Sequence, residues 1–224
     1  MTQCKTGMAG TRLVLIDLDG TLIDSIGDIH AAVNLMLAEQ DQAALALPDV
    51  RRMVGDGAAV LIERVMAARP AIGIDASAAL QRYLDLYEAE PLGLTRLYPG
   101  VAETLDRLRQ RGYRLAVCTN KPERPSRTIL ESFGLSDRFE RIVGGDSLPW
   151  RKPDRRMLDG IMADLGETIA TTVLVGDSEV DAAAAAAAEM PFVLMSYGYR
   201  RGPVETIQCR AALDDFADLT TLFA

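Results

Sequence analysis

The sequence has few of the residues that bind soft metals or form redox sites. Its three cysteines, Cys4, Cys118 and Cys209, are widely separated, and His30 is the one histidine among 224 residues. These numbers exclude a disulfide-rich fold and a zinc site, which need cysteine or histidine at short spacings. They are typical of a protein from a reducing compartment, so we expect a cytoplasmic location. His30 falls in a predicted helix, and we assign it no catalytic role.

Long apolar runs and an excess of basic charge are also absent. No stretch approaches the roughly 20 apolar residues of a membrane span, and the first residues lack the apolar core of a signal peptide. The formal net charge is −8, which argues against a nucleic-acid partner because such proteins carry basic surfaces. Hydrophobic residues make up 49% of the chain, enough for one large domain or a domain with an insert. We expect a small-molecule partner and no membrane, in a monomer or homodimer.

Lysine is rare in this chain. There are 21 arginines but three lysines, Lys5, Lys121 and Lys152. Because arginine is the ordinary surface cation here, a lysine within the chain is a candidate for a specific role. Lys152, in Arg151-Lys152-Pro153-Asp154, is the stronger candidate and Lys121 the weaker one. A loop lysine before a proline also has a purely structural interpretation.

The apolar pattern divides the chain into two kinds of segment. Residues 13–16 predict a buried strand, whereas residues from about 26 to 90 follow helical spacing, interrupted by proline and glycine into about four helices. After a second boundary at residues 91–100, helix and strand alternate, with strands predicted at residues 114–118, 141–143, 172–175 and 192–195.

This alternation predicts an α/β fold with a parallel sheet and right-handed crossovers. The first strand belongs to that sheet, so the helical region is an insert after strand one. We therefore expect a core made of residues 12–24 and 92–224, and a helical domain made of residues 25–91.

The carboxyl ends of three predicted strands carry residues that can bind a metal or a phosphate. They are Asp17 and Asp19, then Thr119 and Asn120, then Asp177, with Asp181 four residues later. Parallel strands present these ends at one edge of a sheet, which is where ligands bind in open α/β folds. Carboxylates without histidine or cysteine form a hard-oxygen site, and Mg²⁺ suits such a site.

The first of these ends is informative because Asp17 directly follows an apolar run. An Asp-Gly pair alone is an ordinary turn, but two carboxylates at a buried strand end are costly without a cation or a chemical role. Mg²⁺, a hydroxyl and a lysine together favour phosphoryl transfer. A carboxylate that attacks a phosphate dianion is repelled by it. Mg²⁺ and the ammonium of Lys152 would offset that repulsion.

Four segments, taken in order, resemble the motifs of the haloacid dehalogenase superfamily of phosphotransferases. They are Asp17-Leu18-Asp19-Gly20-Thr21, Thr119-Asn120, Lys152-Pro153 and Gly176-Asp177-Ser178-Glu179-Val180-Asp181. The resemblance covers about residues 12–223. It implies a Rossmann-like parallel sheet, and the insert directly after the first motif implies a mobile helical cap of the C1 type.

The resemblance also implies roles for individual residues. Asp17 is expected to be the nucleophile, and Asp19 the general acid that later activates water as a base. Mg²⁺ is expected to be held by Asp17, the backbone carbonyl of Asp19, and Asp177, with Asp181 farther out or bridged by water. The residues expected to bind the phosphoryl group or the rest of the substrate are Thr119, Asn120, Lys152, Gly20, Gly55, Asp56 and Gly57.

Within the superfamily the chain is most similar to the phosphoglycolate phosphatases, in residues 98–101, 118–122, 143–149 and 196–199. The implied reaction releases glycolate and phosphate from 2-phosphoglycolate. A phosphatase for a sugar phosphate, a nucleotide or pyrophosphate stays open, as does a sugar-phosphate mutase. A non-catalytic relative would be expected to lack one of the three main aspartates, and none is missing.

Two details go beyond the motifs. Arg51 or Arg52, beside the predicted cap loop at residues 55–57, is a candidate to bind the carboxylate of the substrate, although both arginines could equally lie on a solvated face. Glu189 stands where the family usually has glycine. If that position needs a left-handed backbone, glutamate is strained there.

Overall fold

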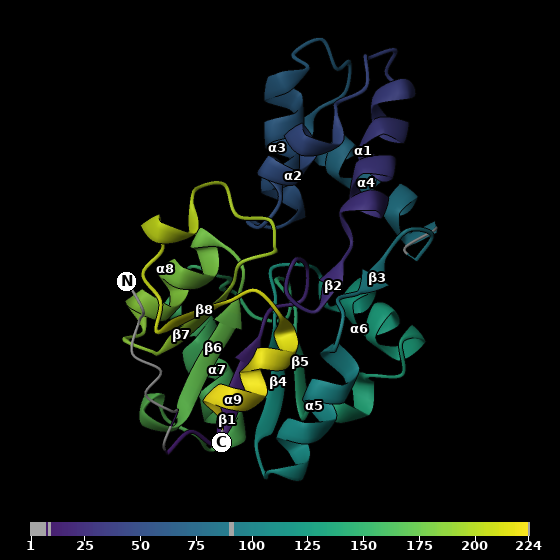
Figure 1. The fold of residues 1–224 in the computed structure, drawn as a ribbon. Coiled ribbons are helices and arrows are strands. Elements are labelled where there is room, and N and C mark those ends of the chain that lie inside the picture. The colour runs from purple at the N-terminus through teal and green to yellow at the C-terminus, as the bar shows by residue number, and fades with distance from the viewer. Residues whose placement is uncertain (1–7, 9, 90–91, 224) are drawn as a thin grey trace.

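The protein is described here by a computed structural model that covers residues 8, 10–89 and 92–223 (Figure 1). Its strands are β1 (Leu13–Ile16), β2 (Ile23–Asp24), β3 (Arg96–Leu97), β4 (Arg114–Cys118), β5 (Arg141–Val143), β6 (Thr172–Gly176), β7 (Phe192–Met195) and β8 (Ala211–Leu213). Its α-helices are α1 (Ile26–Ala38), α2 (Leu47–Met53), α3 (Ala58–Ala68), α4 (Ala76–Ala89), α5 (Val101–Gln110), α6 (Glu123–Ser132), α7 (Arg155–Leu165), α8 (Glu179–Ala187) and α9 (Leu219–Leu222). Short 3₁₀ turns occur at Ser136–Arg138, Ile169–Thr171, Val204–Thr206 and Phe216–Asp218.

Six strands of the described chain form one parallel sheet in the order β5-β4-β1-β6-β7-β8. The first strand is central, with Leu13 opposite Arg114 on one side and Thr172 on the other. The predicted α/β fold is confirmed, and each predicted strand ends within one residue of its predicted limits. Strand β8 was not predicted, because it is three residues long and buries only Leu213.

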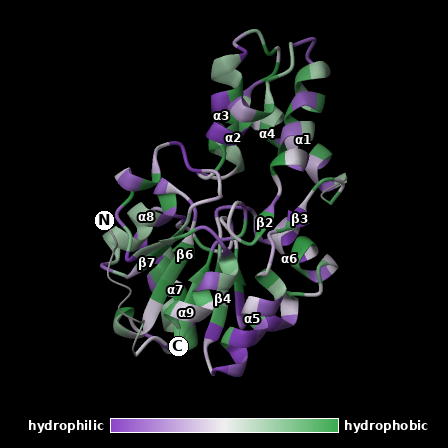
Figure 2. Ribbon diagram, in the orientation of Figure 1, coloured by the Kyte–Doolittle hydropathy of each residue, from purple (hydrophilic) through white to green (hydrophobic). Residues whose placement is uncertain are grey.

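Both faces of the sheet are covered by helices. Val14 and Ile16 of β1 pack with α5, α6 and α9 on one face, and Leu13 and Leu15 pack with α7 and α8 on the other. Figure 2 shows hydrophobic strands between helices that carry hydrophilic residues on their outer sides. Because successive side chains point to opposite faces and both faces are buried, β1 is a continuous apolar run. None of the helices in the described ranges combines the length and hydropathy needed to cross a membrane.

Helices α1–α4 stand beyond the carboxyl ends of the sheet strands (Figure 1). Their buried side chains form a separate hydrophobic cluster, which also takes in Tyr199 from the segment after β7. The chain enters the helical segment after β2 and returns from it before β3. These two strands lie side by side, because they pair antiparallel with Ile23 opposite Leu97. The predicted boundary at residue 91 falls on residues 90–91, which lie outside the described residues. The helical segment is thus joined to the sheet at one narrow junction.

Asp28, in the first turn of α1, stabilises the junction between the helical segment and the sheet. Its carboxylate is buried and accepts hydrogen bonds from the N–H of Leu94 and from the N–H and hydroxyl of Thr95. Hydrogen bonds to an ionised group are among the stronger ones in proteins. They hold the returning chain against the start of the helical segment.

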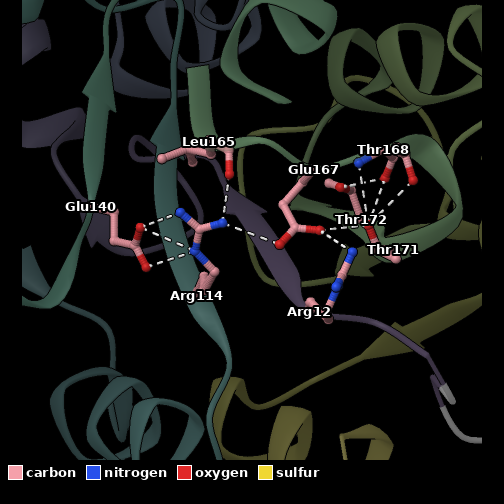
Figure 3. Close-up of polar contacts among 8 residues, drawn as sticks. All are labelled: Arg12, Arg114, Glu140, Leu165, Glu167, Thr168, Thr171 and Thr172. Carbon is pink, nitrogen blue, oxygen red and sulfur yellow. Dashed lines mark hydrogen bonds and ion pairs between the residues drawn. The ribbon is translucent and has the colours of Figure 1, made fainter. Parts of the chain in front are cut away.

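A second polar cluster lies at the opposite end of the sheet (Figure 3). Arg114, at the start of β4, donates to Glu140, to Glu167 and to the carbonyl of Leu165. Arg12, which precedes β1, lies 3.0 Å from the other oxygen of Glu167. The cluster joins the amino ends of neighbouring strands to the segment that follows α7. Its place, far from the strands' carboxyl ends, indicates a structural role.

Glu189 follows α8 and adopts a φ of 55°. The backbone is therefore left-handed at this position, as the sequence comparison with family patterns suggested. Glutamate is less favourable than glycine in that conformation because of its Cβ. The side chain is exposed, so the strain is local and does not reach the sheet.

Candidate active site

Three polar strand ends meet at the carboxyl edge of the sheet because β4, β1 and β6 are neighbours. Asp17, Asp177 and Asp181 each place one carboxylate oxygen within 4.8 Å of the others, and all three residues are buried. The N–H of Asp17 donates to the carbonyl of Val175 at 2.9 Å, which continues the β1–β6 ladder by one residue. The nucleophile candidate is thus held by the sheet itself.

These buried carboxylates carry more negative charge than their surroundings neutralise. Burial raises the pKa of Asp17 to about 7; Lys152 opposes this rise and Asp181 adds to it. Burial also raises the pKa of Asp177 well above its ordinary value, and the neighbouring carboxylates of Asp181 and Asp17 add to the rise. An all-oxygen donor set with unneutralised charge fits a divalent cation such as Mg²⁺.

Lys152 is the cation inside this cluster. Its Nζ lies 2.9 Å from Asp17 Oδ1 and 2.6 Å from Asp181 Oδ1, and its side chain is fully buried. Burial opposes the charge of Lys152, but Asp17 and Asp181 hold its pKa above the ordinary value. The lysine therefore stays protonated beside the nucleophile candidate, where the sequence placed an ammonium.

Asp19 is not part of the three-carboxylate cluster. Its carboxylate accepts hydrogen bonds from Ser25 Oγ at 2.5 Å and from Lys121 Nζ at 3.1 Å. A tight turn reverses the chain after it, with the N–H of Gly20 donating to the carbonyl of Ile23 at 2.8 Å. The side chain of Asp19 is thus engaged with Ser25 and Lys121, and the expected contact of its backbone carbonyl with a metal stays a prediction.

Gly20 allows this turn for two reasons. Its φ is 85°, and a Cβ built on it would lie 2.3 Å from Asp177 Oδ2. A side chain at this position would therefore meet both backbone strain and a direct clash. The expected contact of Gly20 with substrate stays a prediction, since the structure shows it packed against a carboxylate of the cluster.

Separate contacts orient the other two carboxylates. Asp177 accepts hydrogen bonds from Thr21 Oγ1 at 2.8 Å and from the N–H of Tyr199 at 2.6 Å. Asp181 lies in the first turn of α8, where it exchanges hydrogen bonds with Ser178 in a capping box. The helix start and the loop after β7 thus fix the geometry of the cluster.

The residues after β4 lie beside Asp17. Thr119 is buried, and the side chain of Asn120 donates to the carbonyls of Lys152, at 2.8 Å, and Gly55, at 3.1 Å. The Asn120 amide group therefore joins the loop that carries Lys152 to the loop at residues 55–57. Its predicted contact with phosphate would have to come from the backbone N–H.

A cavity separates the sheet edge from the helical segment. The volume that the centre of a water molecule can occupy is about 50 Å³, so the cavity has room for more than one water-sized group. The sheet side contributes Asp17, Asp19, Thr119, Asn120 and Lys121, and the helical side includes Gly55, Gly57, Leu61, Tyr83 and Tyr87. Such a volume suits a small leaving group.

Two polar residues at or near the loop at residues 55–57, Asp56 and Arg51, bind groups outside the cavity. Asp56 forms ion pairs with Arg64, at 2.6 Å, and Arg201, and among the described residues it is not part of the cavity wall. Arg51 donates to the carbonyls of Tyr197 and Gly198. Gly55 and Gly57 thus line the cavity and Asp56 does not, and the expected contacts of these residues with substrate stay predictions.

Arg52 also lies away from the cavity. It is exposed and pairs with Asp49 one helical turn earlier. Neither Arg51 nor Arg52 belongs to the described cavity wall. The idea that one of them binds a substrate carboxylate has no support in this arrangement.

Sequence reasoning missed two tyrosines that contact the site. Tyr87, on α4, accepts a hydrogen bond from Lys121 Nζ at 2.7 Å, and the Tyr199 hydroxyl accepts from the N–H groups of Ser25 and Ile26. The helical spacing of Tyr87 indicates a buried face without saying what covers it. Tyr199 lay in a segment noted for its family resemblance, which was the available signal.

Comparisons with known proteins agree with this geometry. The family model described as haloacid dehalogenase-like hydrolase matches residues 14–195. The chain is 48% identical to a phosphoglycolate phosphatase of Cereibacter sphaeroides over 196 residues, covering 87% of this chain and 89% of the relative. It is 44% identical to a phosphoglycolate phosphatase of Rhodospirillum rubrum over 214 residues, covering 93% and 89%.

A solved structure resembles the whole chain. The crystal structure of a predicted phosphoglycolate phosphatase from Haemophilus somnus superposes with a TM-score of 0.92 at 31% identity, covering 97% of this chain and 100% of that one. The similarity includes the helical segment as well as the sheet, since nearly every residue of both chains is matched.

Proposed function

The chain belongs to the haloacid dehalogenase-like hydrolase family, and from this premise we propose that it is a magnesium-dependent phosphatase that hydrolyses 2-phosphoglycolate through an aspartyl-phosphate. The observation that carries the proposal is the meeting of Asp17 with Lys152 and two further buried carboxylates. A carboxylate that attacks a phosphate dianion needs compensating positive charge, and this cluster is suited to supply it. The names of the most similar relatives support the substrate.

Mg²⁺ would be held by Asp17, Asp177 and the backbone carbonyl of Asp19. The raised pKa of Asp17, to about 7, supports a bound cation, because burial leaves its negative charge poorly compensated. When bound, Mg²⁺ would offset the combined charge of the carboxylates and the phosphate. Asp181 would remain with Lys152, 2.6 Å away, and orient that lysine.

The proposed reaction has two steps. First, a carboxylate oxygen of Asp17 forms a bond to phosphorus while the bond from phosphorus to the ester oxygen breaks. Asp19 gives its proton to that oxygen, because an alkoxide leaves poorly without one. Asp19 then takes a proton from water, whose oxygen attacks phosphorus and releases phosphate and the free carboxylate of Asp17. Lys152 and Thr119 hold the phosphoryl oxygens in both steps.

We also propose that residues 25–91 act as a cap over a core of residues 12–24 and 92–224, in a cytoplasmic enzyme. Contacts between the two parts support this assignment: Asn120 donates to Gly55, Lys121 to Tyr87, and Arg51 to Gly198. A closed cap limits the access of bulk water and strengthens electrostatic interactions in the site.

A phosphate-release assay with purified protein tests the proposal. The substrates are 2-phosphoglycolate, sugar phosphates, nucleotides and pyrophosphate, each with Mg²⁺ or with EDTA. We expect 2-phosphoglycolate to have the highest kcat/KM, with activity lost in EDTA and restored by Mg²⁺. A higher kcat/KM for another ester would contradict the substrate, and full activity in EDTA would contradict the metal. Mass spectrometry after an acid quench should find the phosphoryl group on Asp17, and its absence would argue against the covalent step.

A further inference from the structure

Lys121 is a buried cation of the cavity to which the proposed reaction assigns no role. Its side chain is 6% exposed, and Nζ lies 3.1 Å from Asp19 Oδ1. Nζ also donates to the Tyr87 hydroxyl at 2.7 Å and lies 4.3 Å from the centre of that ring. Nζ also lies 3.2 Å from the second oxygen of Asp19. An ammonium has three donors, and two of them are directed at one carboxylate, so an anion that enters the cavity can take one of them while the other stays with Asp19.

The wall of the cavity gives that donor its significance. The helical side contributes apolar groups such as Ile29, Leu61 and Leu84, and the sheet side contributes two carboxylates, Asp17 and Asp19. An anionic group that enters such a space loses its hydration and needs an opposite charge. Among the described lining residues, Lys121 is the cation.

Position favours the same conclusion. Asp19, the proposed proton donor, must reach the ester oxygen of the leaving group. Lys121 is hydrogen-bonded to Asp19, so it lies beside the atoms attached to that oxygen. In 2-phosphoglycolate the carboxylate is joined to the carbon next to the ester oxygen. Arg51 donates to the backbone carbonyls of Tyr197 and Gly198. Lys121 is therefore the better placed of the two cations to bind the carboxylate of the substrate.

We propose that Lys121 determines specificity by binding an anionic group next to the phosphate ester, which is the carboxylate in 2-phosphoglycolate. The proposal rests on the proposed function and names the residue that would select its substrate. Tyr87 holds the ammonium in place from the cap. Substrates whose leaving group is uncharged would have no partner for Lys121.

The test compares 2-phosphoglycolate with its uncharged amide, 2-phosphoglycolamide, which has nearly the same shape. The ratio of kcat/KM for the acid to that for the amide is measured in the wild type, Lys121→Met and Arg51→Gln. We expect the ratio to fall by about 10- to 150-fold in Lys121→Met, the equivalent of a roughly 1.5–3 kcal/mol hydrogen bond to a charged group. Arg51→Gln, the matched loss of a cation that is not part of the cavity wall, should change both substrates equally and keep the ratio.

Each outcome has a distinct meaning. If Lys121→Met slows both substrates by the same factor, the lysine only positions Asp19 and the proposal is overturned. A fall of the ratio in Arg51→Gln instead would assign the carboxylate to the cap arginine and also overturn it. Lys121→Gln, which retains a hydrogen-bond donor without the charge, replaces Lys121→Met if that variant does not fold, and the same fall is expected. A wild type that does not prefer the acid contradicts the proposed substrate, and this inference with it, before any variant is considered.

Discussion

Replacing Asp17 by Asn should stabilise the metal-free protein at pH 8 while it abolishes phosphate release. Burial raises the pKa of this carboxyl from 3.8 to about 7. Between those two values the folded protein keeps a proton that the unfolded chain has lost, so stability falls as the pH rises through this window. The difference between these two pKa values corresponds to about 1.36 kcal/mol per unit. Above pH 7, the ionised carboxylate therefore lowers the free energy of unfolding by on the order of 4 kcal/mol. An asparagine of the same shape has no such charge to bury.

Thermal unfolding of the wild type and Asp17→Asn in EDTA measures this difference. A chain of this size gains roughly 2–4 °C in Tm per kcal/mol, so the variant should melt about 8–16 °C higher at pH 8. At pH 5, where the wild-type carboxyl keeps its proton, the gain should be less than half as large. Mg²⁺ should stabilise the wild type more than the variant. A variant that melts at or below the wild-type temperature at pH 8 in EDTA would refute the idea that Asp17 carries an uncompensated charge.

Four further changes probe other parts of the molecule. Asp19→Asn should lower kcat for an alkyl phosphate by about 10²–10⁴-fold; unchanged turnover would show that Asp19 is not the proton donor. Gly20→Ala places a methyl 2.3 Å from a carboxylate oxygen and should lower both Tm and metal affinity, measured by calorimetry, whereas wild-type affinity would mean that the loop relaxes freely. Glu167→Ala removes one of the two carboxylates that pair with Arg114, and the partner of Arg12 (Figure 3), and should lower the free energy of unfolding in urea by roughly 2 kcal/mol without changing kcat. Glu189→Gly should raise Tm, since glycine relieves a cost of about 1 kcal/mol at φ 55°; a lower Tm would count against strain at this position.

Strand positions were predictable because the apolar pattern of a doubly covered sheet is continuous. All four residues of β1 are buried, and the parallel arrangement then brings the ends of β1, β4 and β6 to one edge. Asp17 and Asp177 are attached rigidly to those ends, so their meeting followed from topology. The strands β2 and β3 could not be recognised, since two residues carry no period, and β8 was missed because it buries one of its three residues, whereas β5, of the same length, buries two.

The contribution of the helical segment to the site was harder to predict. Tyr87 occupies a buried position on α4, and its spacing alone does not distinguish a contact inside the helical cluster from one with Lys121. Asp56 was expected at the substrate, but arginines 8 and 145 residues away pair with its carboxylate. These pairings depend on the position of the helical segment relative to the sheet. That position is set by contacts between residues far apart in the sequence, so a local sequence pattern does not predict it.

The same contacts connect the catalytic candidates to the position of the helical segment. Tyr199 donates its N–H to Asp177, and its hydroxyl accepts from Ser25 and Ile26 at the junction with α1. Lys121 connects Asp19 to Tyr87 in a similar way. A ligand shifts a conformational equilibrium only by its difference in affinity for the two states. Because an anionic leaving group on Lys121 would bind where both parts meet, we expect substrate selection and closure of the helical segment to be one coupled equilibrium.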